Sequence, residues 1–126
     1  MPSLTLTQAQ SVIARDTHRF RVVNCGRRFG KTTLAVEEIK GLALAKESRI
    51  AYIAPTFAQA RDIAWSMLIR ELKPIIKKIN ETRLELEVTN KDGGTSYIFL
   101  RGWEAIDTLR GQKFDFVVIE IGRAHV

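Results

Sequence analysis

The chain has 126 residues, enough for one domain with its own core, and 45% of them are hydrophobic and 27% charged, as in ordinary soluble proteins. No apolar run reaches the ~20 residues of a membrane helix, the N-terminus lacks a secretory-signal pattern, and the lone Cys25 excludes an internal disulfide. The net charge of +6 fits either a nucleic-acid partner or a solvated surface rich in Lys and Arg.

The first half of the chain alternates helical and strand patterns. These patterns predict a short helix at 6–15, a strand at 19–25, a loop at 26–30, a helix at 31–46 and a strand at 49–54. Thr5 or Thr7 is the expected N-cap of the first helix, and Pro55 is expected to end the second strand.

The second half predicts a long helix, a hairpin and a buried strand. The helix runs from 57 towards 79, and Pro74 is expected to kink or split it. The later elements are strands at 83–89 and 96–101 around a turn at 90–94, a helical turn near 105–109, and an apolar strand at 114–119. This order indicates an α/β fold with a mainly parallel sheet.

The stretch CGRRFGKTT, residues 25–33, lies between the first predicted strand and the helix after it. It ends like the phosphate-binding pattern G-x-x-x-x-G-K-[ST], with Gly30, Lys31 and Thr32 in place, but Cys25 stands where the first glycine is usual. Backbone N–H groups at such a turn cradle phosphate oxygens, the lysine reaches the β- and γ-phosphates, and the hydroxyl ligates Mg²⁺. The context favours a nucleotide-binding loop over an accidental helix N-terminus.

Two arginines inside this loop, Arg27 and Arg28, have two interpretations. Either could stabilise negative charge that develops on a γ-phosphate during transfer. Alternatively, both point away from the loop and pair with surface carboxylates. The residues alone leave these alternatives open.

The stretch GRRFGKTT resembles the modified Walker A motif of the large terminase subunit of tailed bacteriophages, the ATP-driven motor that packages DNA into a procapsid. In that family the loop often lacks the first glycine and carries an arginine four residues before the lysine, which corresponds to Arg27. The resemblance runs over residues 6–119 and implies that Arg27 is catalytic and that Thr32 ligates Mg²⁺. The implied nucleotide-binding residues are Gln10, Gly26, Arg28, Phe29, Gly30, Lys31, Thr32 and Thr33.

Three further segments resemble the same family. The segment LTQAQ, residues 6–10, resembles its adenine-reading motif, with Gln10 as the candidate. LTLTQ, residues 4–8, fits the same template and makes Gln8 a rival, and a plain exposed helix residue is the alternative for either glutamine. YIAPTFAQA, residues 52–60, resembles a strand-to-helix segment that terminases share with helicases. Its Pro55 and Thr56 are either ligand contacts or a strand terminator with a helix N-cap.

The third segment, LRGQKFDFVVI at 109–119, resembles the approach to the Walker B motif. Its Arg110 faces nucleotide, DNA or a neighbouring subunit, or is a plain surface residue. The two tryptophans, Trp65 and Trp103, could stack on bases, but core packing is the expectation for both.

The end of the chain does not complete the Walker B motif. Phe116 to Ile119 supply its apolar run, but Glu120 stands at the position of the Mg²⁺-holding aspartate and Ile121 at that of the water-activating glutamate. The tail EIGRAHV and a stop codon can be encoded by a DNA string that looks like a common sequencing adapter. We therefore expect residues 120–126 to be non-native, which makes Glu120 a doubtful catalytic or metal residue and His125 no candidate.

The resemblance implies the N-terminal portion, residues 1–119, of a P-loop NTPase domain of RecA/ASCE-like fold, truncated after the Walker B strand. The implied ligands and partners are ATP, Mg²⁺, double-stranded viral DNA, a portal protein and a small terminase subunit. The parent would continue into a nuclease domain and act in the cytoplasm of the bacterial host without a membrane, as a possible homo-oligomeric ring. We expect the fragment to bind ATP weakly, to hydrolyse it poorly, and to aggregate or fold only partly because of its exposed sheet edge.

Two alternatives stay open at the level of sequence. The first is the N-terminal fragment of a helicase-type P-loop ATPase, which would continue into a second RecA-like domain. The second is a non-enzymatic module that binds nucleotide or DNA.

Overall fold

The computed structural model describes residues 20–23, 29–105 and 112–120, and for 20–23, 29–32, 34 and 120 it describes only the backbone. The strands are β1 (Phe20–Val23), β2 (Arg49–Ala54), β3 (Ile76–Asn80), β4 (Glu85–Thr89), β5 (Thr95–Gly102) and β6 (Phe116–Glu120). The helical elements are α2 (Phe29–Ala45), α3 (Phe57–Gln59), the π-helix η1 (Ala60–Trp65), α4 (Ser66–Leu72) and the 3-10 helix η2 (Lys73–Ile75).

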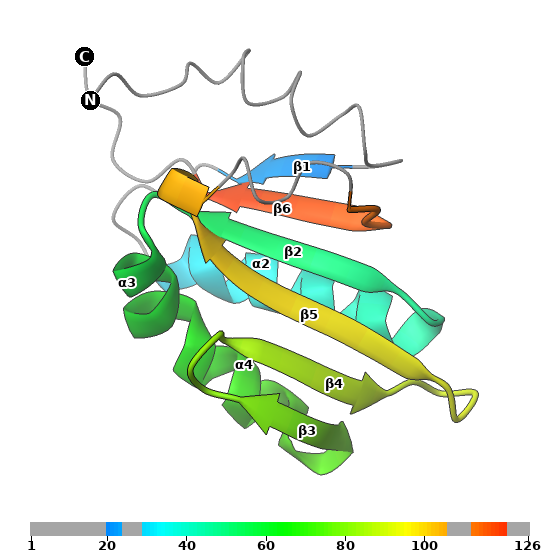
Figure 1. The fold of residues 1–126 in the computed structure, drawn as a ribbon. Coiled ribbons are helices and arrows are strands. Elements are labelled where there is room, and N and C mark those ends of the chain that lie inside the picture. Colours follow the sequence, from blue (N-terminus) through cyan, green and yellow to red (C-terminus); the bar gives the residue numbers. More distant parts are fainter. Residues whose placement is uncertain (1–19, 24–28, 106–111, 121–126) are drawn as a thin grey trace.

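The strands form one sheet in the order β1-β6-β2-β5-β4-β3 (Figure 1). The pairs β1–β6, β6–β2 and β2–β5 are parallel, whereas β5–β4 and β4–β3 are antiparallel. This confirms the expected α/β class with a mainly parallel sheet. Its central strands β2 and β6 read as continuous apolar runs, as strands buried on both faces do.

The helices pack behind the sheet in the view of Figure 1, on the face that carries the larger core. In strand β5, every second residue lies on this helix-covered face. Its side chains alternate between buried and half-buried along the strand, because successive residues of a strand point to opposite faces. Ser96, Ile98 and Leu100 therefore face the helices, while Tyr97 and Phe99 face the other side.

Residues 57–72 form one helical segment whose middle part, η1, is π-helical. Its buried residues Ala60, Ala64, Leu68 and Leu72 recur at every fourth position. With 3.6 residues per turn, each four-residue step in an α-helix rotates the buried position by about 40°. The wider π turn, bonded i→i+5, reduces this drift and keeps the four side chains on the sheet.

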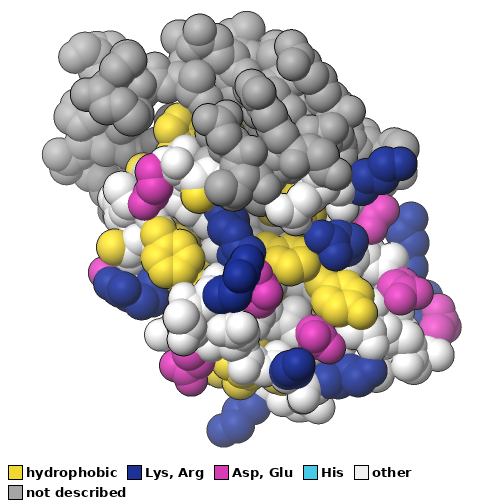
Figure 2. All heavy atoms as spheres, in the orientation of Figure 1, with side chains coloured by type: hydrophobic (Ala, Val, Ile, Leu, Met, Phe, Trp, Pro, Cys, Tyr) yellow, Lys and Arg dark blue, Asp and Glu magenta, His cyan; other side chains and the backbone are white. Residues whose placement is uncertain are grey.

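A smaller core lies on the opposite face of the sheet. It consists of Ala51, Ile53, Phe114, Val117 and Ile119, with Phe99 and Trp103 half-buried against it. Beside it, the described part of this face carries hydrophobic and basic side chains next to one another (Figure 2). The guanidinium of Arg49 lies 4.8 Å from the ring centre of Phe99 and 5.5 Å from that of Phe114, so charge and ring stabilise each other.

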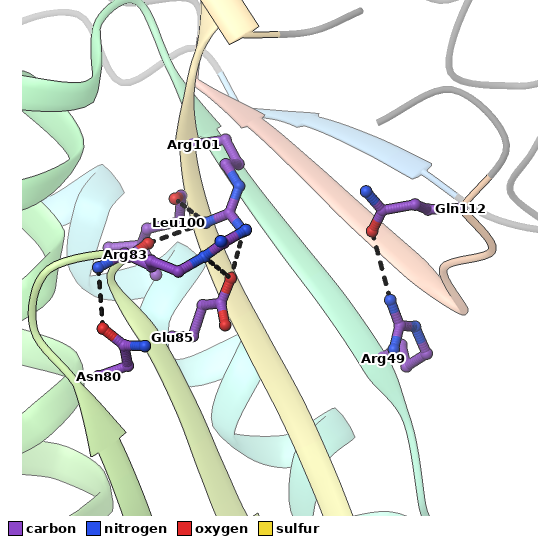
Figure 3. Close-up of polar contacts among 7 residues, drawn as sticks. All are labelled: Arg49, Asn80, Arg83, Glu85, Leu100, Arg101 and Gln112. Atoms are coloured by element: carbon purple, nitrogen blue, oxygen red, sulfur yellow. Dashed lines mark hydrogen bonds and ion pairs between the residues drawn. The ribbon is translucent and has the colours of Figure 1, made fainter. Parts of the chain in front are cut away.

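The β3–β4–β5 region is tied together by polar side chains (Figure 3). Arg101 on β5 donates to the backbone oxygens of Arg83 (2.9 Å) and Leu100 (2.8 Å) and pairs with Glu85 on β4. The turn before β4 also places Leu84 at φ 58°, a left-handed conformation that is rare for leucine, and buries its side chain. Burial of Leu84 in the core stabilises this turn against the cost of its backbone conformation.

One prediction was wrong in this region. The helix expected from 57 towards 79 ends at Leu72, and residues 76–79 belong to strand β3. Pro74 lies in η2 and interrupts the helical bonding, as expected, but the chain then pairs with β4 instead of resuming a helix. The β-branched Ile76 and Ile79 fit the strand.

Most other elements match their predictions to within two residues or so. The 49–54 strand is confirmed at both ends, and the hairpin strands and α2 shift by one or two residues. Trp65 is buried and Trp103 half-buried, so core packing is confirmed. The predicted helix at 6–15 lies outside the described residues, as does most of the turn near 105–109.

Candidate nucleotide-binding site

Four parallel strands end at one edge of the sheet. Val23 of β1 lies beside Glu120 of β6, and Ala54 of β2 lies beside Gly102 of β5. The pairing of Ile53 with Ile119 joins these two halves of the edge. In open α/β sheets, ligands bind outside such carboxyl ends.

β1 ends at Val23 and α2 begins at Phe29, and residues 24–28 between them lie outside the described residues. α2 begins at Phe29, so Gly30, Lys31 and Thr32 occupy its first turn. This is the strand-loop-helix frame that the sequence predicts. No acidic residue lies in the first turn of α2, so no carboxylate there offsets the positive end of the helix dipole.

Thr33, the next residue of α2, has an exposed side chain described by the structure. Its Oγ1 donates to the sulfur of Met67 on α4, with 3.8 Å between oxygen and sulfur. A second contact joins the same two helices further along. Lys40 of α2 pairs with Glu71 of α4, with 3.6 Å between Nζ and Oε1. α2 is therefore linked to α4 by two polar contacts.

The turn from β2 to α3 lies at the same edge of the sheet, after the end of β2 at Ala54. Thr56 is the N-cap of α3, and its Oγ1 accepts a hydrogen bond from the Gln59 amide at 3.0 Å. Of the two interpretations of Pro55 and Thr56, the strand terminator with a helix N-cap is confirmed. A ligand contact for either residue stays a prediction.

Two residues at this edge carry structural roles that the sequence analysis missed. Gly102 ends β5 so close to the β2–α3 turn that a Cβ there would collide with the Glu104 carboxylate, the Phe57 amide and the Thr56 carbonyl carbon. Glu104 accepts a hydrogen bond from the Phe57 amide at 3.3 Å. A glycine that closes an alternating strand is the signal that could have pointed to this close approach.

The structure leaves most predicted site residues untested. Gln8, Gln10, Gly26, Arg27, Arg28 and Arg110 lie outside the described residues, as does His125, which was not a candidate. Only the backbone is described for Phe29, Gly30, Lys31, Thr32 and Glu120. The backbone places Glu120 beside Val23, the last residue of β1. Within the described ranges, no three His, Cys, Asp or Glu side chains cluster as a metal site, and no helix is long and apolar enough to span a membrane.

Comparisons with known proteins agree with this arrangement. Residues 22–120 match the family model of the terminase large subunit, T4likevirus-type, N-terminal part. The structure is similar to the large terminase ATPase domain of Thermus phage P74-26, with a TM-score of 0.61 and 26% identity over 94% of this chain. An arginine-to-alanine mutant of that domain gives a TM-score of 0.54 and 25% identity over 94% of this chain.

In both cases this chain covers 53% of the solved domain, so it spans about half of that domain's length. Among curated proteins, none matches this chain significantly. The family match begins within β1, at Val22, and includes residues 24–28, α2 and every later strand up to Glu120. The chain therefore belongs to the family of terminase large subunits, T4likevirus-type, and corresponds to their N-terminal part.

Proposed function

We propose that this chain is the nucleotide-binding portion of a viral DNA-packaging motor, and that residues 26–33 bind the phosphates of ATP. The observation that carries the proposal is the family match over residues 22–120, which spans a glycine-containing loop between a parallel strand and a helix. The family membership also favours this function over the helicase alternative. The site fits a nucleotide because the first turn of a helix has amides without intrahelical partners, and that of α2 carries Lys31 and Thr32 and no acidic residue.

In this proposal each residue of the loop has its own role. The backbone amides from Gly26 to Lys31 hold phosphate oxygens, Lys31 neutralises the β- and γ-phosphates, and the Thr32 hydroxyl ligates Mg²⁺. Arg27 stabilises charge on the γ-phosphate, and Gln10, or its rival Gln8, reads the adenine. Bound Mg²⁺ supplies charge neutralisation at the phosphates.

The test of this site is nucleotide binding by the Lys31→Ala variant. Titration with a fluorescent ATP analogue and Mg²⁺ should show binding by the parent chain and a loss of at least about tenfold in affinity for Lys31→Ala. Lys46→Ala is the matched control, because it removes the same charge from an exposed position immediately after α2. Equal affinities of all three proteins would show that the loop binds no phosphate.

We further propose that hydrolysis is weak because the motif at the end of β6 is not native after residue 119. Glu120 stands in place of an aspartate and Ile121 in place of the glutamate that activates water. The double variant Glu120→Asp/Ile121→Glu should raise the turnover of ATP by at least about tenfold. Resequencing the source DNA across codon 120 directly tests whether residues 120–126 are native. A native stop codon after Val126 would reject the proposal that they are not.

For the whole parent protein we propose an ATP-driven motor that moves double-stranded viral DNA into a procapsid in the cytoplasm of a bacterial host. Its partners would be a portal protein and a small terminase subunit, with a nuclease domain downstream and a ring of several copies. These roles follow from the family and from the proposed nucleotide site. They are tested by packaging assays with the full-length protein, in which Lys31→Ala should abolish DNA uptake.

A further inference from the structure

The helical segment 57–72 is fixed at both of its ends. At its start, Thr56 caps α3, Glu104 accepts from the Phe57 amide, and Gly102 brings the end of β5 against this turn. The start of the segment therefore belongs to the rigid edge of the sheet. A shift of this start away from the end of β5 would break the Glu104 hydrogen bond.

The other end of the segment is fixed to α2 rather than to the sheet edge. Met67 accepts the hydrogen bond of Thr33, and Glu71 pairs with Lys40. The side chains of Lys40 and Glu71 are about one third exposed, so solvent screens this pair and its strength is that of a surface contact. Thr33 lies two residues after Lys31, so a displacement of the first turns of α2 reaches α4 through Met67 directly.

Between the two anchors lies the π-helix η1. Its i→i+5 bonding has one more residue per bonded turn than an α-helix, and such turns inside helices are frequent at functional sites. The residues it buries include two alanines, Ala60 and Ala64, which allow the helix to lie close to the sheet. A change in the distance between the two anchors has to be taken up in this segment.

We propose that η1 senses whether the phosphate loop is occupied, with Met67 as the positioning residue that transmits movement of α2 to it. This inference rests on the proposed function, because it takes ATP at the N-terminus of α2 as the signal. Phosphate binding fixes the first turn of α2, Thr33 holds α4 to that turn, and the η1 backbone becomes more protected.

The experiment is amide hydrogen exchange of the whole chain with and without saturating ATP and Mg²⁺, read by mass spectrometry. Exchange at 60–65 should slow by about threefold or more on addition of ATP, while exchange in the distant turn at 90–94 stays unchanged. Met67→Leu keeps the apolar volume but removes the sulfur acceptor, so it should bind ATP and lose most of the protection at 60–65. Glu71→Gln should reduce this protection partially, and Glu81→Gln, an exposed glutamate in the turn before β4, is its matched control.

Three results would decide against the inference, and they are distinguishable. If ATP binds and exchange at 60–65 does not change, the sensing role is wrong and the nucleotide site stands. If Met67→Leu retains the full ATP-dependent protection, Met67 is not the positioning residue. If ATP does not bind at all, both the proposed function and this inference fall.

Discussion

The two halves of the sheet are held together in different ways. The parallel half, β1, β6 and β2, joins segments that are far apart in sequence, and its buried side chains are mostly aliphatic. The hairpin half, β3, β4 and β5, joins neighbours through short turns and fixes them with polar side chains. The candidate site lies at the end of the parallel half, so the function depends on long-range pairing while the hairpin half is secured locally.

The largest effect is expected at Gly102, where β5 of the hairpin half pairs with β2 of the parallel half. Gly102→Ala should lower the free energy of unfolding by about 3 kcal/mol, because the new methyl group collides with backbone atoms of the β2–α3 turn. Urea unfolding followed by circular dichroism measures the change. Gly41→Ala is the control: a Cβ there meets nothing within 4 Å, and alanine in a helix should stabilise the protein slightly. A Gly102→Ala variant as stable as the parent chain would show that the turn yields easily.

The next effect concerns the bond between the hairpin half and α2. The buried hydroxyl of Ser96 accepts from the Ser48 amide (3.1 Å) and donates to the Ala43 oxygen (2.8 Å). Ser96→Ala should cost about 2 kcal/mol, because these buried backbone groups lose their partner. Ser66→Ala, at an exposed helix position, should change the unfolding free energy by less than about 0.5 kcal/mol. Equal unfolding midpoints for the two variants would contradict this account.

A matched pair of arginines tests how the hairpin half is fixed. Arg101 and Arg83 both contact Glu85, but the Arg101 side chain is 14% exposed and the Arg83 side chain 68%. Arg101→Met should destabilise the protein by about 1.5 kcal/mol, since two backbone oxygens also lose a donor. Arg83→Met should cost less than about 0.5 kcal/mol, as is usual for exposed ion pairs. Thermal unfolding of both variants in parallel measures the difference, and similar losses would show that burial of Arg101 is unimportant.

The smallest effect is expected in the turn between β4 and β5. Asn90 Oδ1 accepts from the amides of Asp92 (2.8 Å) and Gly94 (2.9 Å), and Gly93 adopts φ 86°. Asn90→Ala should therefore cost about 1 kcal/mol. Asp92→Ala, which leaves the accepting side chain in place, should be nearly neutral. Chemical denaturation distinguishes the two, and a neutral Asn90→Ala would show that the turn forms without its side-chain bonds.

The sequence predicted the parallel half well at the level of elements. β2 is a run of apolar and β-branched residues ended by Pro55, and α2 follows a loop with a recognisable phosphate-binding pattern. The roles of Lys31, Thr32 and the loop arginines remain predictions. The order of the strands could not be predicted from the sequence, because a run of valines and isoleucines does not indicate which distant strand it pairs with.

The sequence missed both the end of the helix and the π-helix because, in each case, the apolar pattern fits more than one backbone conformation. Residues 57–72 show apolar positions four apart, which agrees with an α-helix closely enough to hide the wider turn of η1. Beyond Pro74, Ile75, Ile76 and Ile79 suit either a helix or a strand by pattern alone, and pairing with β4 decided it. The close approach at Gly102 depends on a contact between segments about 45 residues apart, and the only sequence signal for it was a glycine at the end of an alternating strand.

Among the described strands, β1 has a single neighbour, β6, whose residues are the last of the described chain to be synthesised. During translation, β1 must therefore wait until β2 to β5 have emerged before its hydrogen-bonding partner β6 exists. Until then β1 presents unpaired amides and carbonyls to the other nascent chains around the ribosome. Slower elongation just before codon 116 would prolong that exposure, so we expect the yield of soluble protein to fall when rare codons are placed there.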